Sequence, residues 1–456
     1  MKAFVSLLLL SVLRILPLEL SSVKEEVVSD RLLGFNVTYA NSPDEMWADG
    51  KLIEAMASVR PGFLRYPGGT VTTFYHWNAL TGNGWTDAWD PSYSVSDNKP
   101  DTEFLTLDEY FDIVERTGGL PMLGVNCNSA FVYGRLEEGI GEALAMMRYV
   151  KEKGHKVRYW YMGNEPFARD GNGGTWSMEQ YAEMILAFAP RMKALDPEIK
   201  IVANASSNFV RNWPDIQVLL DRAGPWIDVI DVHFYWSHGT ANWERWTSIT
   251  PCTMWGGNSF EAEVGYFHRK AAEAGYPNLE LATLEWNCGP STRAAVPLTT
   301  SGQLTLIQSE MLMQFMRGGM DMACFWPLFW GGSSVHRGFV HKFGRELLPV
   351  AYIMRDLGAF QGLHLIECQG EDLIPNSLVL AVKDPSDGTV RLAFLNKTPD
   401  RIAISLQGAA LPEGGMARIK SYHMDASLLD IIREDECTCD RNRLLAEPFS
   451  LTIVVL

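Results

Sequence analysis

Two glutamates stand in short motifs that interrupt apolar, strand-like sequence. Glu165 lies in YMGNEPF, between an asparagine and a proline, and Glu285 lies in LEWN, 120 residues further on. Two carboxyl groups that face each other across a cleft can divide the work of acid and nucleophile or base. A single glutamate beside asparagine and proline is more often a helix cap or a solvated turn. Chemistry therefore requires a fold that brings these two residues together.

The chain from residue 31 to about 358 alternates short apolar runs with helical segments. Leu107, Tyr110, Phe111 and Val114, for example, have the i, i+3, i+4, i+7 spacing of a helix with one apolar face. The expected strands are 31–40, 62–68, 120–128, 157–165, 200–206, 228–235, 279–286 and 321–327. The expected helices lie near 46–59, 105–117, 138–153, 177–195, 213–222, 258–275, 300–318 and 346–357.

Eight such strand–helix units predict an α/β fold, a (β/α)8 TIM barrel. The strands are too uniformly apolar to be exposed on one face, as expected for a parallel sheet covered on both sides. An open doubly wound sheet is the alternative. That fold favours a G-x-G-x-x-G loop after the first strand, and GFNVTYANSPDE (34–45) contains none.

The remainder of the chain has a different pattern. After about residue 359, short and partly alternating apolar runs are separated by Gly, Pro and Asp turns, which is typical of a small antiparallel β-sandwich. There is room for a short N-terminal strand to join it. The expected organisation is a leader over 1–22, a catalytic barrel over 23–358 and a C-terminal β-sandwich domain over 359–456.

The N-terminus, MKAFVSLLLLSVLRILPLELSS, resembles a secretory signal peptide, with Lys2 before an apolar run and cleavage near Ser21 or Ser22. Arg14 interrupts the run, so a misassigned start or a disordered tail is the alternative. The expected localisation is secreted or periplasmic. No later stretch approaches the roughly 20 apolar residues of a transmembrane helix, so no membrane partner is expected after signal removal.

Composition excludes some partners. The net charge is −16, with 55 acidic and 39 basic residues, which argues against nucleic acid or anionic membrane surfaces. The seven cysteines form no CxxC framework, and His233 and His238 lack the spacing and the carboxylate partner of a metal pair. The aspartate-rich stretch 87–103 is better explained by solvation than by calcium. Two carboxylates need no cofactor, so neither an organic cofactor nor a metal is expected.

Polar residues at the carboxyl ends of the predicted strands would face the mouth of the barrel, where barrel enzymes carry their active sites. Strands 4 and 7 face one another across that mouth, and they end in Glu165 and Glu285. Two glutamates over a cleft rimmed by aromatic residues suit hydrolysis of a glycosidic bond. The other polar or aromatic residues at strand ends are Arg65, Tyr66, Asn126, Asn128, Asn164, Asn204, His233, Tyr235 and Trp326.

Several motifs resemble a known superfamily. MGNEPF on strand 4, DVHFYW on strand 6 and LEWN on strand 7 resemble the clan A glycoside hydrolases. FLRYPGGTVTTFYHW on strand 2 and ALDPEIKIVANASS before strand 5 resemble the branch that holds α-L-arabinofuranosidases and, nearby, β-agarases and β-porphyranases. The resemblance spans roughly residues 31–456, because these families also carry a β-sandwich beside the barrel.

The resemblance implies roles for the strand-4 and strand-7 motifs. Glu165 would be the general acid/base and Glu285 the nucleophile of a retaining enzyme, and Asn164 would hydrogen-bond the sugar 2-OH. An acid needs its proton, so the pKa of Glu165 is expected to be raised, with apolar neighbours such as Trp160 and Phe167 available to desolvate it.

The resemblance also assigns partners to the nucleophile. Arg65 and Tyr235 would hold Glu285 ionised and correctly aimed. His233, two residues before Tyr235 on the same side of its strand, is a candidate for binding a substrate hydroxyl, with a buried structural histidine as the alternative. Indole rings in glycine-rich loops and at strand ends could stack on sugar faces, although loop packing is an equal alternative. The three tryptophans expected to bind substrate are Trp77, Trp236 and Trp326.

The expected substrate is a polysaccharide or oligosaccharide. The long, tryptophan-rich strand-2 loop, the aromatic segment after strand 6 and FWPLFW at strand 8 favour a β-linked galactan, as in agarases and porphyranases. The alternative is an α-L-arabinofuranosidase, which the segment between strands 4 and 5 favours. An alternative of another class is a carbohydrate-binding protein without catalysis. Oligomeric state has no sequence signal.

Overall fold

A computed structural model describes most of the chain, in two compact units. The described residues are 15–38, 46–79, 86–94, 105–167, 176–236, 243–253, 257–288, 301–330, 337–341, 346–423 and 437–456. One unit runs from Val27 to Gly362, and the other joins the residues up to Glu26 with Leu363–Leu456. None of the helices in the described ranges combines the length and apolarity needed to cross a membrane.

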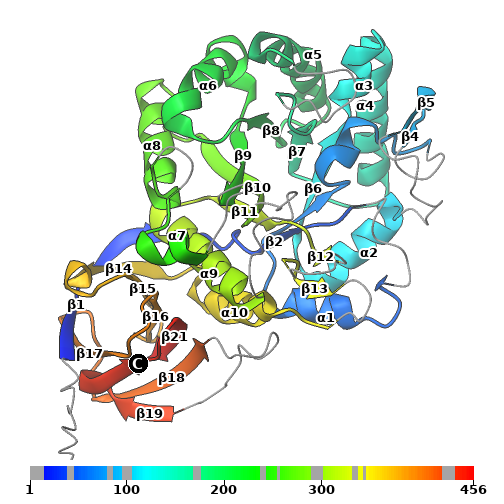
Figure 1. Ribbon diagram of the computed structural model, residues 1–456. Helices are drawn as coiled ribbons and strands as arrows, with labels where there is room; N and C mark the ends of the chain where they lie inside the picture. Colours follow the sequence, from blue (N-terminus) through cyan, green and yellow to red (C-terminus); the bar gives the residue numbers. More distant parts are fainter. Residues whose placement is uncertain are drawn as a thin grey trace, which may run out of the picture. The chain divides into compact units, whose positions relative to one another are not determined.

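The first unit is the predicted barrel. Eight parallel strands close in chain order, and each corresponds to one of the eight strands expected from the sequence (Figure 1). They are β2 (Gly34–Asn36), β3 (Phe63–Tyr66), β6 (Leu120–Val125), β7 (Tyr159–Met162), β8 (Lys200–Ala205), β9 (Val229–Trp236), β10 (Glu280–Cys288) and β11 (Met322–Phe325). Inward-facing side chains such as Phe63, Met122, Tyr161 and Leu284 fill the interior. The (β/α)8 prediction is confirmed.

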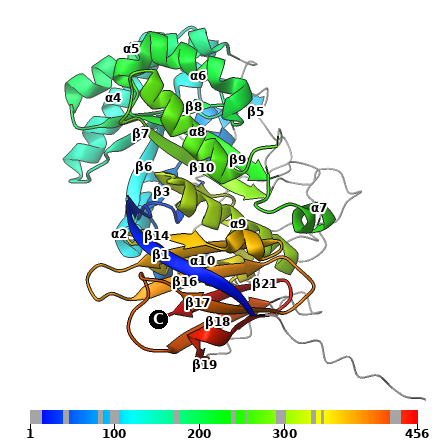
Figure 2. The same ribbon diagram turned by 90° about the vertical axis from the view of Figure 1, so that its left-hand side faces the viewer.

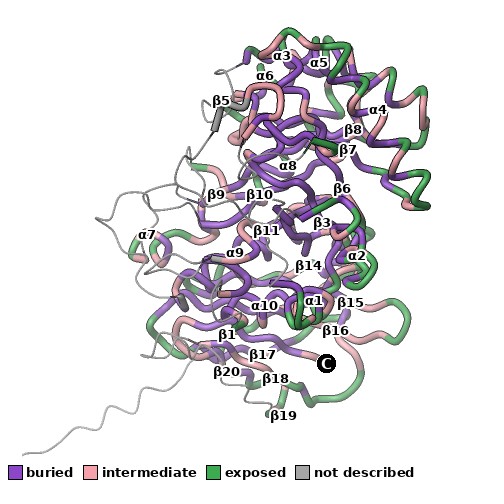
Figure 3. Tube along the Cα trace, turned by 90° about the vertical axis from the view of Figure 1, so that its right-hand side faces the viewer, coloured by how far each residue is buried: buried purple, intermediate pink, exposed green. Residues whose placement is uncertain are grey.

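The barrel helices also match the helical segments of the sequence. They are α1 (Lys51–Ser58), α2 (Leu107–Thr117), α4 (Leu136–Glu152), α5 (Met178–Leu195), α6 (Phe209–Ala223), α8 (Phe260–Glu273), α9 (Ser301–Gly318) and α10 (Pro349–Leu357). Figure 3 shows the strands almost entirely buried, whereas the outer turns of helices such as α4 are exposed. Capping explains several ends: Thr106 and Glu109 form a capping box on α2, which ends at Gly118 with φ +75°.

Several short elements were not expected from the sequence. Two are helices, α3 (Cys127–Val132) and α7 (Trp243–Ser248). The predicted strand 120–128 ends at Val125, because the Asn126 side chain accepts a hydrogen bond from the Ser129 N–H and caps α3. Two small ribbons lie in the loops after strands 2 and 8, formed by β4 (Thr86–Asp87), β5 (Asp90–Ser94), β12 (Phe329–Trp330) and β13 (Val340–His341).

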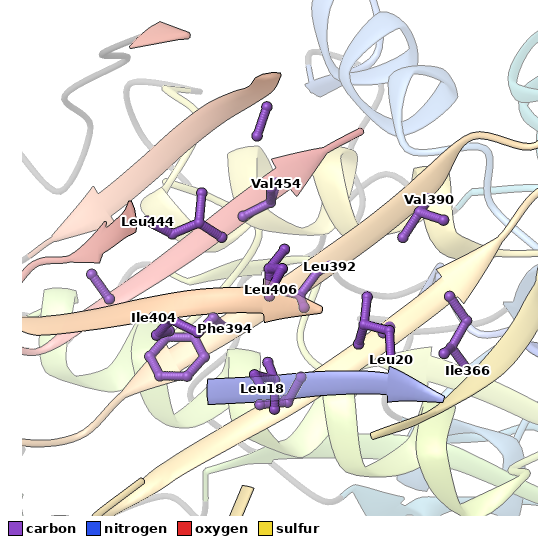
Figure 4. Packing of buried hydrophobic residues seen from close by; sticks show 14 of the residues in the cluster. Leu18, Leu20, Ile366, Val390, Leu392, Phe394, Ile404, Leu406, Leu444 and Val454 are labelled. Carbon is purple, nitrogen blue, oxygen red and sulfur yellow. The ribbon is translucent and has the colours of Figure 1, made fainter. Parts of the chain in front are cut away.

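The second unit is a nine-stranded sheet that wraps around one apolar core. Its order is β19-β18-β21-β16-β15-β14-β1-β17-β20 (Figure 2). Ala417 near one end of this order and Leu444 at the other belong to the same buried cluster, together with Leu18 and Phe394 (Figure 4). The sheet therefore folds over its core as a sandwich does. The strands are β1 (Ile15–Val27), β14 (His364–Gln369), β15 (Ser377–Lys383), β16 (Val390–Asn396), β17 (Ile402–Gln407), β18 (Met416–His423), β19 (Cys437–Asp440), β20 (Leu444–Ala446) and β21 (Ser450–Val455).

The sandwich differs from the expectation at its N-terminal strand. Residues 15–22, assigned to a leader from the sequence, form the first part of β1, which pairs in parallel with β17 from Ile15↔Ala403 to Glu19↔Gln407. The sheet is therefore mixed, not wholly antiparallel. Leu18 and Leu20 are fully buried, because the apolar run that resembles a signal segment supplies core residues here. Cleavage near Ser21 would remove this paired segment. Export stays a prediction, which N-terminal sequencing of the mature protein would test.

The boundary between the units also lies slightly later than expected. Residues 359–362 belong to the barrel unit, not to the sandwich. The Gln361 side chain accepts a hydrogen bond from the Leu32 N–H, and the Gly362 N–H donates to the Val28 carbonyl, so both residues are tied to the start of the barrel.

Candidate active site

The two glutamates meet at the carboxyl ends of β7 and β10. A single imidazole lies between them: Nδ1 of His233 is 2.6 Å from Oε1 of Glu165 and 3.5 Å from Oε2 of Glu285. One nitrogen or oxygen atom of each of the three side chains lies within 4.8 Å of those of the other two. Register explains the contact, since His233 on β9 is the direct parallel neighbour of Glu285 on β10. The expectation that strands 4 and 7 bring the glutamates together is met.

The backbone at Glu165 has an unusual conformation. Its φ is +43°, in the left-handed region that a glutamate rarely adopts, and it follows Gly163 at φ +70°. Such a residue costs about 1–3 kcal/mol and persists only where its surroundings fix it. The side-chain oxygen of Asn204, from the next strand, accepts the Glu165 N–H at 3.0 Å. The Gly-Asn-Glu-Pro sequence thus turns the chain so that the carboxyl group, still partly exposed, points into the mouth of the barrel.

Arg65 organises the floor of the site. It is completely buried, and its Nη1 donates to Oε1 of Glu285 at 2.9 Å and to Oδ1 of Asn36 at 3.0 Å. Its Nη2 donates to Oδ1 of Asn164 at 2.6 Å, and its guanidinium carbon lies 4.4 Å from the centre of the Tyr161 ring. Because the side-chain oxygen of Asn164 accepts this hydrogen bond from Arg65, its amide N–H groups can donate to another acceptor.

Glu285 is held from both sides. Tyr235 donates its hydroxyl to Oε2 at 2.8 Å, while Arg65 binds Oε1. Burial and the charge of Glu285 both raise the pKa of Tyr235 well above its usual value, so the phenol keeps its proton and remains a donor. Burial disfavours the charge on Arg65, but Tyr161 and Glu285 outweigh this effect and raise its pKa. Glu285 is therefore positioned as an aimed carboxylate, as the sequence implied.

His233 carries a proton in this environment. Burial would lower its pKa, but the charges of Glu285, Asp231 and Glu165 prevail and raise it to about 10. Burial alone would likewise raise the pKa of Glu165, yet the charge and hydrogen bond of His233 lower it. The expectation of a raised Glu165 pKa is therefore wrong. Burial is the largest single influence on the pKa of Glu165, but the charge and hydrogen bond of His233, with a further contribution from Arg65, outweigh it.

The predicted tryptophans separate into two groups. Trp326 and Trp77 are half-buried; the Trp326 ring lies over Gly69, and Trp77 packs against Tyr149. Trp236 is only 1% exposed, so it cannot stack on a sugar in this structure, and that expectation is wrong. His233 and Tyr235 point into the barrel, so Trp236, one residue further along β9, points the opposite way. His238 lies outside the described residues.

Three site residues escaped the sequence interpretation. Asp231 lies 3.3 Å from Nε2 of His233 and accepts a hydrogen bond from Asn204. Its signal was present, because it is a charged residue in an apolar strand, two positions before His233. Asn36 and Tyr161 support Arg65 from β2 and β7. Neither has a charge that would have distinguished it from its neighbours.

The site could also present metal ligands. Glu165, His233 and Glu285 place one nitrogen and two oxygens close enough for a single ion. Nδ1 of a protonated His233 is a donor and not a ligand, and its short contact with Glu165 suits a charge-assisted hydrogen bond. The donor set therefore fits proton sharing better than metal binding, and the expectation of no metal stays a prediction.

Comparisons with known proteins agree with this geometry. Residues 55–249 match the family model described as alpha-L-arabinofuranosidase 1 domain. Alpha-L-arabinofuranosidase C of Emericella nidulans is 26% identical over 220 residues, which cover 41% of this chain and 40% of that protein. The chain therefore spans about 40% of the length of this curated relative.

Solved structures share the whole architecture. The alpha-L-arabinofuranosidase of Thermotoga maritima, solved as an arabinose complex, superposes with a TM-score of 0.68 at 16% identity, covering 97% of this chain and 99% of that one. The bifunctional glucanase-xylanase CelM2 from a metagenome library gives 0.65 at 14% identity, covering 97% and 99%. At these identities the likeness establishes the fold, a TIM barrel with a β-sandwich.

Fold, strand-end motifs and relatives together define a class. The chain resembles the clan A retaining glycoside hydrolases, as its strand-4 and strand-7 motifs predicted. Within that clan it resembles the arabinofuranosidase branch.

Proposed function

We propose that the protein is a retaining glycoside hydrolase acting by a two-glutamate double displacement. The spacing of Glu165 and Glu285 carries the proposal. Retaining enzymes place their carboxyl groups about 5–5.5 Å apart, and inverting enzymes about 6.5–9.5 Å apart to admit a water. The facing oxygens of Glu165 and Glu285 lie within 4.8 Å of each other, which supports retention.

In the first step Glu285 attacks the anomeric carbon. An Oε–C1 bond forms as the glycosidic C–O bond breaks, and the leaving oxygen takes a proton from Glu165. Arg65 and Tyr235 hold both oxygens of the nucleophile, which fixes its direction of attack. In the second step a water gives its proton to Glu165 and its oxygen to C1, releasing the sugar and restoring Glu285.

The proton for the first step is available from the Glu165–His233 pair. The pair holds one proton across a 2.6 Å contact, so it can shift to the carboxyl group when a leaving oxygen begins to gain charge. Formation of the glycosyl ester then removes the charge of Glu285. This charge is the largest of those that raise the pKa of His233, so the imidazole holds its proton less tightly in the intermediate.

For the substrate we propose a terminal α-L-arabinofuranoside. The family model and the named relatives support this alternative better than the galactan expectation. The galactan argument rested partly on aromatic loops, and one of its residues, Trp236, is buried. Asn164, with its oxygen occupied by Arg65, has N–H groups free to donate to the sugar 2-OH, a role that stays a prediction.

A substrate panel with product analysis tests the proposal. Nitrophenyl α-L-arabinofuranoside and arabinan are expected to be hydrolysed, with agarose, porphyran and xylan as comparisons. Proton NMR of the first product should show the same anomeric configuration as the substrate. Inversion would contradict the roles of the two glutamates. Cleavage of agarose with arabinan untouched would restore the galactan interpretation.

A further inference from the structure

A second cavity lies at the opposite end of the barrel, at the amino ends of four consecutive strands. Its volume is about 700 Å³, and its lining comes from the segments that lead into β2, β3, β6 and β7. This size is within the range of small-molecule sites, about 300–1,000 Å³. The amino ends of barrel strands ordinarily serve stability, so a cavity of this size there has no part in the proposed hydrolysis.

The lining of this cavity is strongly basic. Arg31, Arg60, Lys156 and Arg158 face it, against a single acidic residue, Asp30. The chain as a whole has 55 acidic and 39 basic residues, so such a concentration of positive charge runs against its composition.

Three of these cations have no counter-ion among the residues that the structure describes. Within the described part of the chain, the side chains of Arg60, Lys156 and Arg158 make no hydrogen bond or ion pair. Exposed arginines elsewhere do find carboxylates: Arg191, for example, donates to Glu137 through both terminal nitrogens. The free N–H donors of the cavity are therefore available to a ligand.

The fourth cation, Arg31, is held in place by hydrogen bonds on one side of the cavity. Nη1 of Arg31 donates to the Tyr159 hydroxyl at 2.9 Å and to Glu280 at 3.0 Å, and Glu280 also binds Lys200 at 2.6 Å. A Cβ on Gly62 would lie 2.4 Å from the Arg31 Cα, so only glycine allows this segment to pack so closely. One side of the cavity is thus rigid before any ligand arrives.

Helix dipoles do not account for the free cations. Cations stabilise helix carboxyl ends only within the last turn. The last turns of α2 and α4 hold other basic residues, Arg116 and Lys151. Arg60 lies beyond the end of α1, after the C-cap Val59, and has φ +56° in the left-handed region.

We propose that this cavity binds a small organic oxyanion, which is a phosphate or sulfate monoester or an ionised carboxylic acid. Planar guanidinium groups match two oxygens of such an anion at once, and a lysine adds a third donor. Leu120, 49% exposed although apolar, lies beside the cations and offers a surface for the carbon part of the ligand. The site depends on its own geometry and stands whether or not the proposed hydrolase activity is found.

Isothermal titration calorimetry of the full chain at low ionic strength tests the proposal. The probes are inorganic pyrophosphate, sulfate and D-glucuronate, with D-glucose as the neutral counterpart. At least one anionic probe is expected to bind at one site per chain, more weakly as salt is added, and glucose is expected not to bind. The probe that binds most tightly identifies the type of oxyanion. Absence of binding by all three anions would overturn the proposal.

Variants locate the site. Arg60→Gln combined with Arg158→Gln should weaken binding about tenfold or more, because each loses charge-assisted hydrogen bonds. Arg148→Gln combined with Arg211→Gln removes the same charge from exposed positions on α4 and α6 and should bind as the parent does. Unchanged melting temperatures without probe establish that both variants fold. Equal losses in the two variants, or no loss in either, would contradict the assignment.

Discussion

The two ends of the barrel use charge in opposite ways. At the carboxyl end, Arg65, His233, Glu165 and Glu285 are bound to one another at 2.6–3.5 Å in a largely buried cluster. At the amino end, three cations around a 700 Å³ cavity have no partner among the described residues. Buried ion pairs gain little net stability, because desolvation offsets their attraction. The paired end is thus organised for chemistry, whereas the unpaired end is ready for an anion from outside.

Replacing the nucleophile should abolish catalysis at the carboxyl end of the barrel. Glu285→Gln removes the attacking oxygen, and kcat is expected to fall about 10⁴-fold or more on arabinofuranosides. Glu280→Gln, on the same strand but at the amino end, is the matched control and should keep its turnover number. Initial rates of both variants under saturating substrate provide the measurement. Full activity in Glu285→Gln would contradict the assignment of Glu285 as nucleophile. Glycan binding that persists without turnover would agree with this assignment.

The acid variant should have an effect that depends on the leaving group. Glu165→Gln is expected to lose about 10²–10⁴-fold in kcat/KM on arabinan, whose leaving alcohol needs a proton. With a dinitrophenyl arabinofuranoside, which leaves without protonation, the formation of the intermediate should proceed nearly as in the parent. Pre-steady-state release of dinitrophenol measures that step. Equal losses on both substrates would indicate that Glu165 is not the acid.

Loss of the Arg65 guanidinium should destabilise the fold as well as abolish activity. Arg65→Gln leaves Glu285 buried without its cation, and breaking such a pair costs about 3–5 kcal/mol in unfolding free energy. Urea denaturation followed by circular dichroism gives this number. A loss below about 1 kcal/mol would show that Glu285 finds another partner or becomes protonated.

The pH dependence of the unfolding free energy should reveal the proton on His233. Because the pKa of His233 is raised from 6.5 to about 10 in the fold, its protonation stabilises the fold fully below pH 6.5. This contribution is lost as pH rises through 10. The unfolding free energy should therefore fall with pH in this window, by up to about 1.4 kcal/mol per unit. His233→Gln should lack this component. His76, whose pKa is raised to about 9 by Asp87 and Glu142 against the effect of burial, contributes separately, so the comparison also needs His76→Gln. Identical slopes in His233→Gln and the parent would contradict the proton assignment.

The smallest effect is expected from replacing Arg31, which lines the cavity at the amino end of the barrel. Arg31→Gln removes one of two cations bound to Glu280, which keeps Lys200. The unfolding free energy should fall by about 1.5–3 kcal/mol, as for a hydrogen bond to a charged group, with kcat/KM unchanged. Thermal melting and a rate assay on one preparation measure both. A large loss of activity would show that the two ends of the barrel are energetically coupled.

The sequence predicted the parts of the molecule that repeat a strong pattern. All eight barrel strands were found because each is a nearly continuous apolar run, and Glu165 and Glu285 because they end two of them. α3 and α7 were missed because six residues are too few to show helical periodicity. An N-terminal strand in the sandwich was expected, but residues 15–22 were assigned to a leader, because an apolar run after a lysine fits both a leader and a buried strand.

The electrostatics of the site could not be read from the sequence. The pKa of Glu165 depends on how close His233 lies, and that distance is set by the pairing of β7, β8 and β9 in the barrel, across 68 residues of sequence. The basic cavity was equally invisible, since its four cations come from three separate connections. The orientation of Trp236, however, could have been predicted from the alternation that placed His233 and Tyr235 inward.

The position of β1 has a consequence for how the protein is made. A ribosome makes this strand before the barrel, yet its neighbours β14 and β17 emerge more than 330 residues later, after the entire barrel. Until then Leu18 and Leu20 have no core to enter and are available to chaperones. The barrel can fold during synthesis, whereas the sandwich closes only when β1 and the strands that follow the barrel are all present. An expression fragment that begins after β1 would lack the strand that joins β14 to β17.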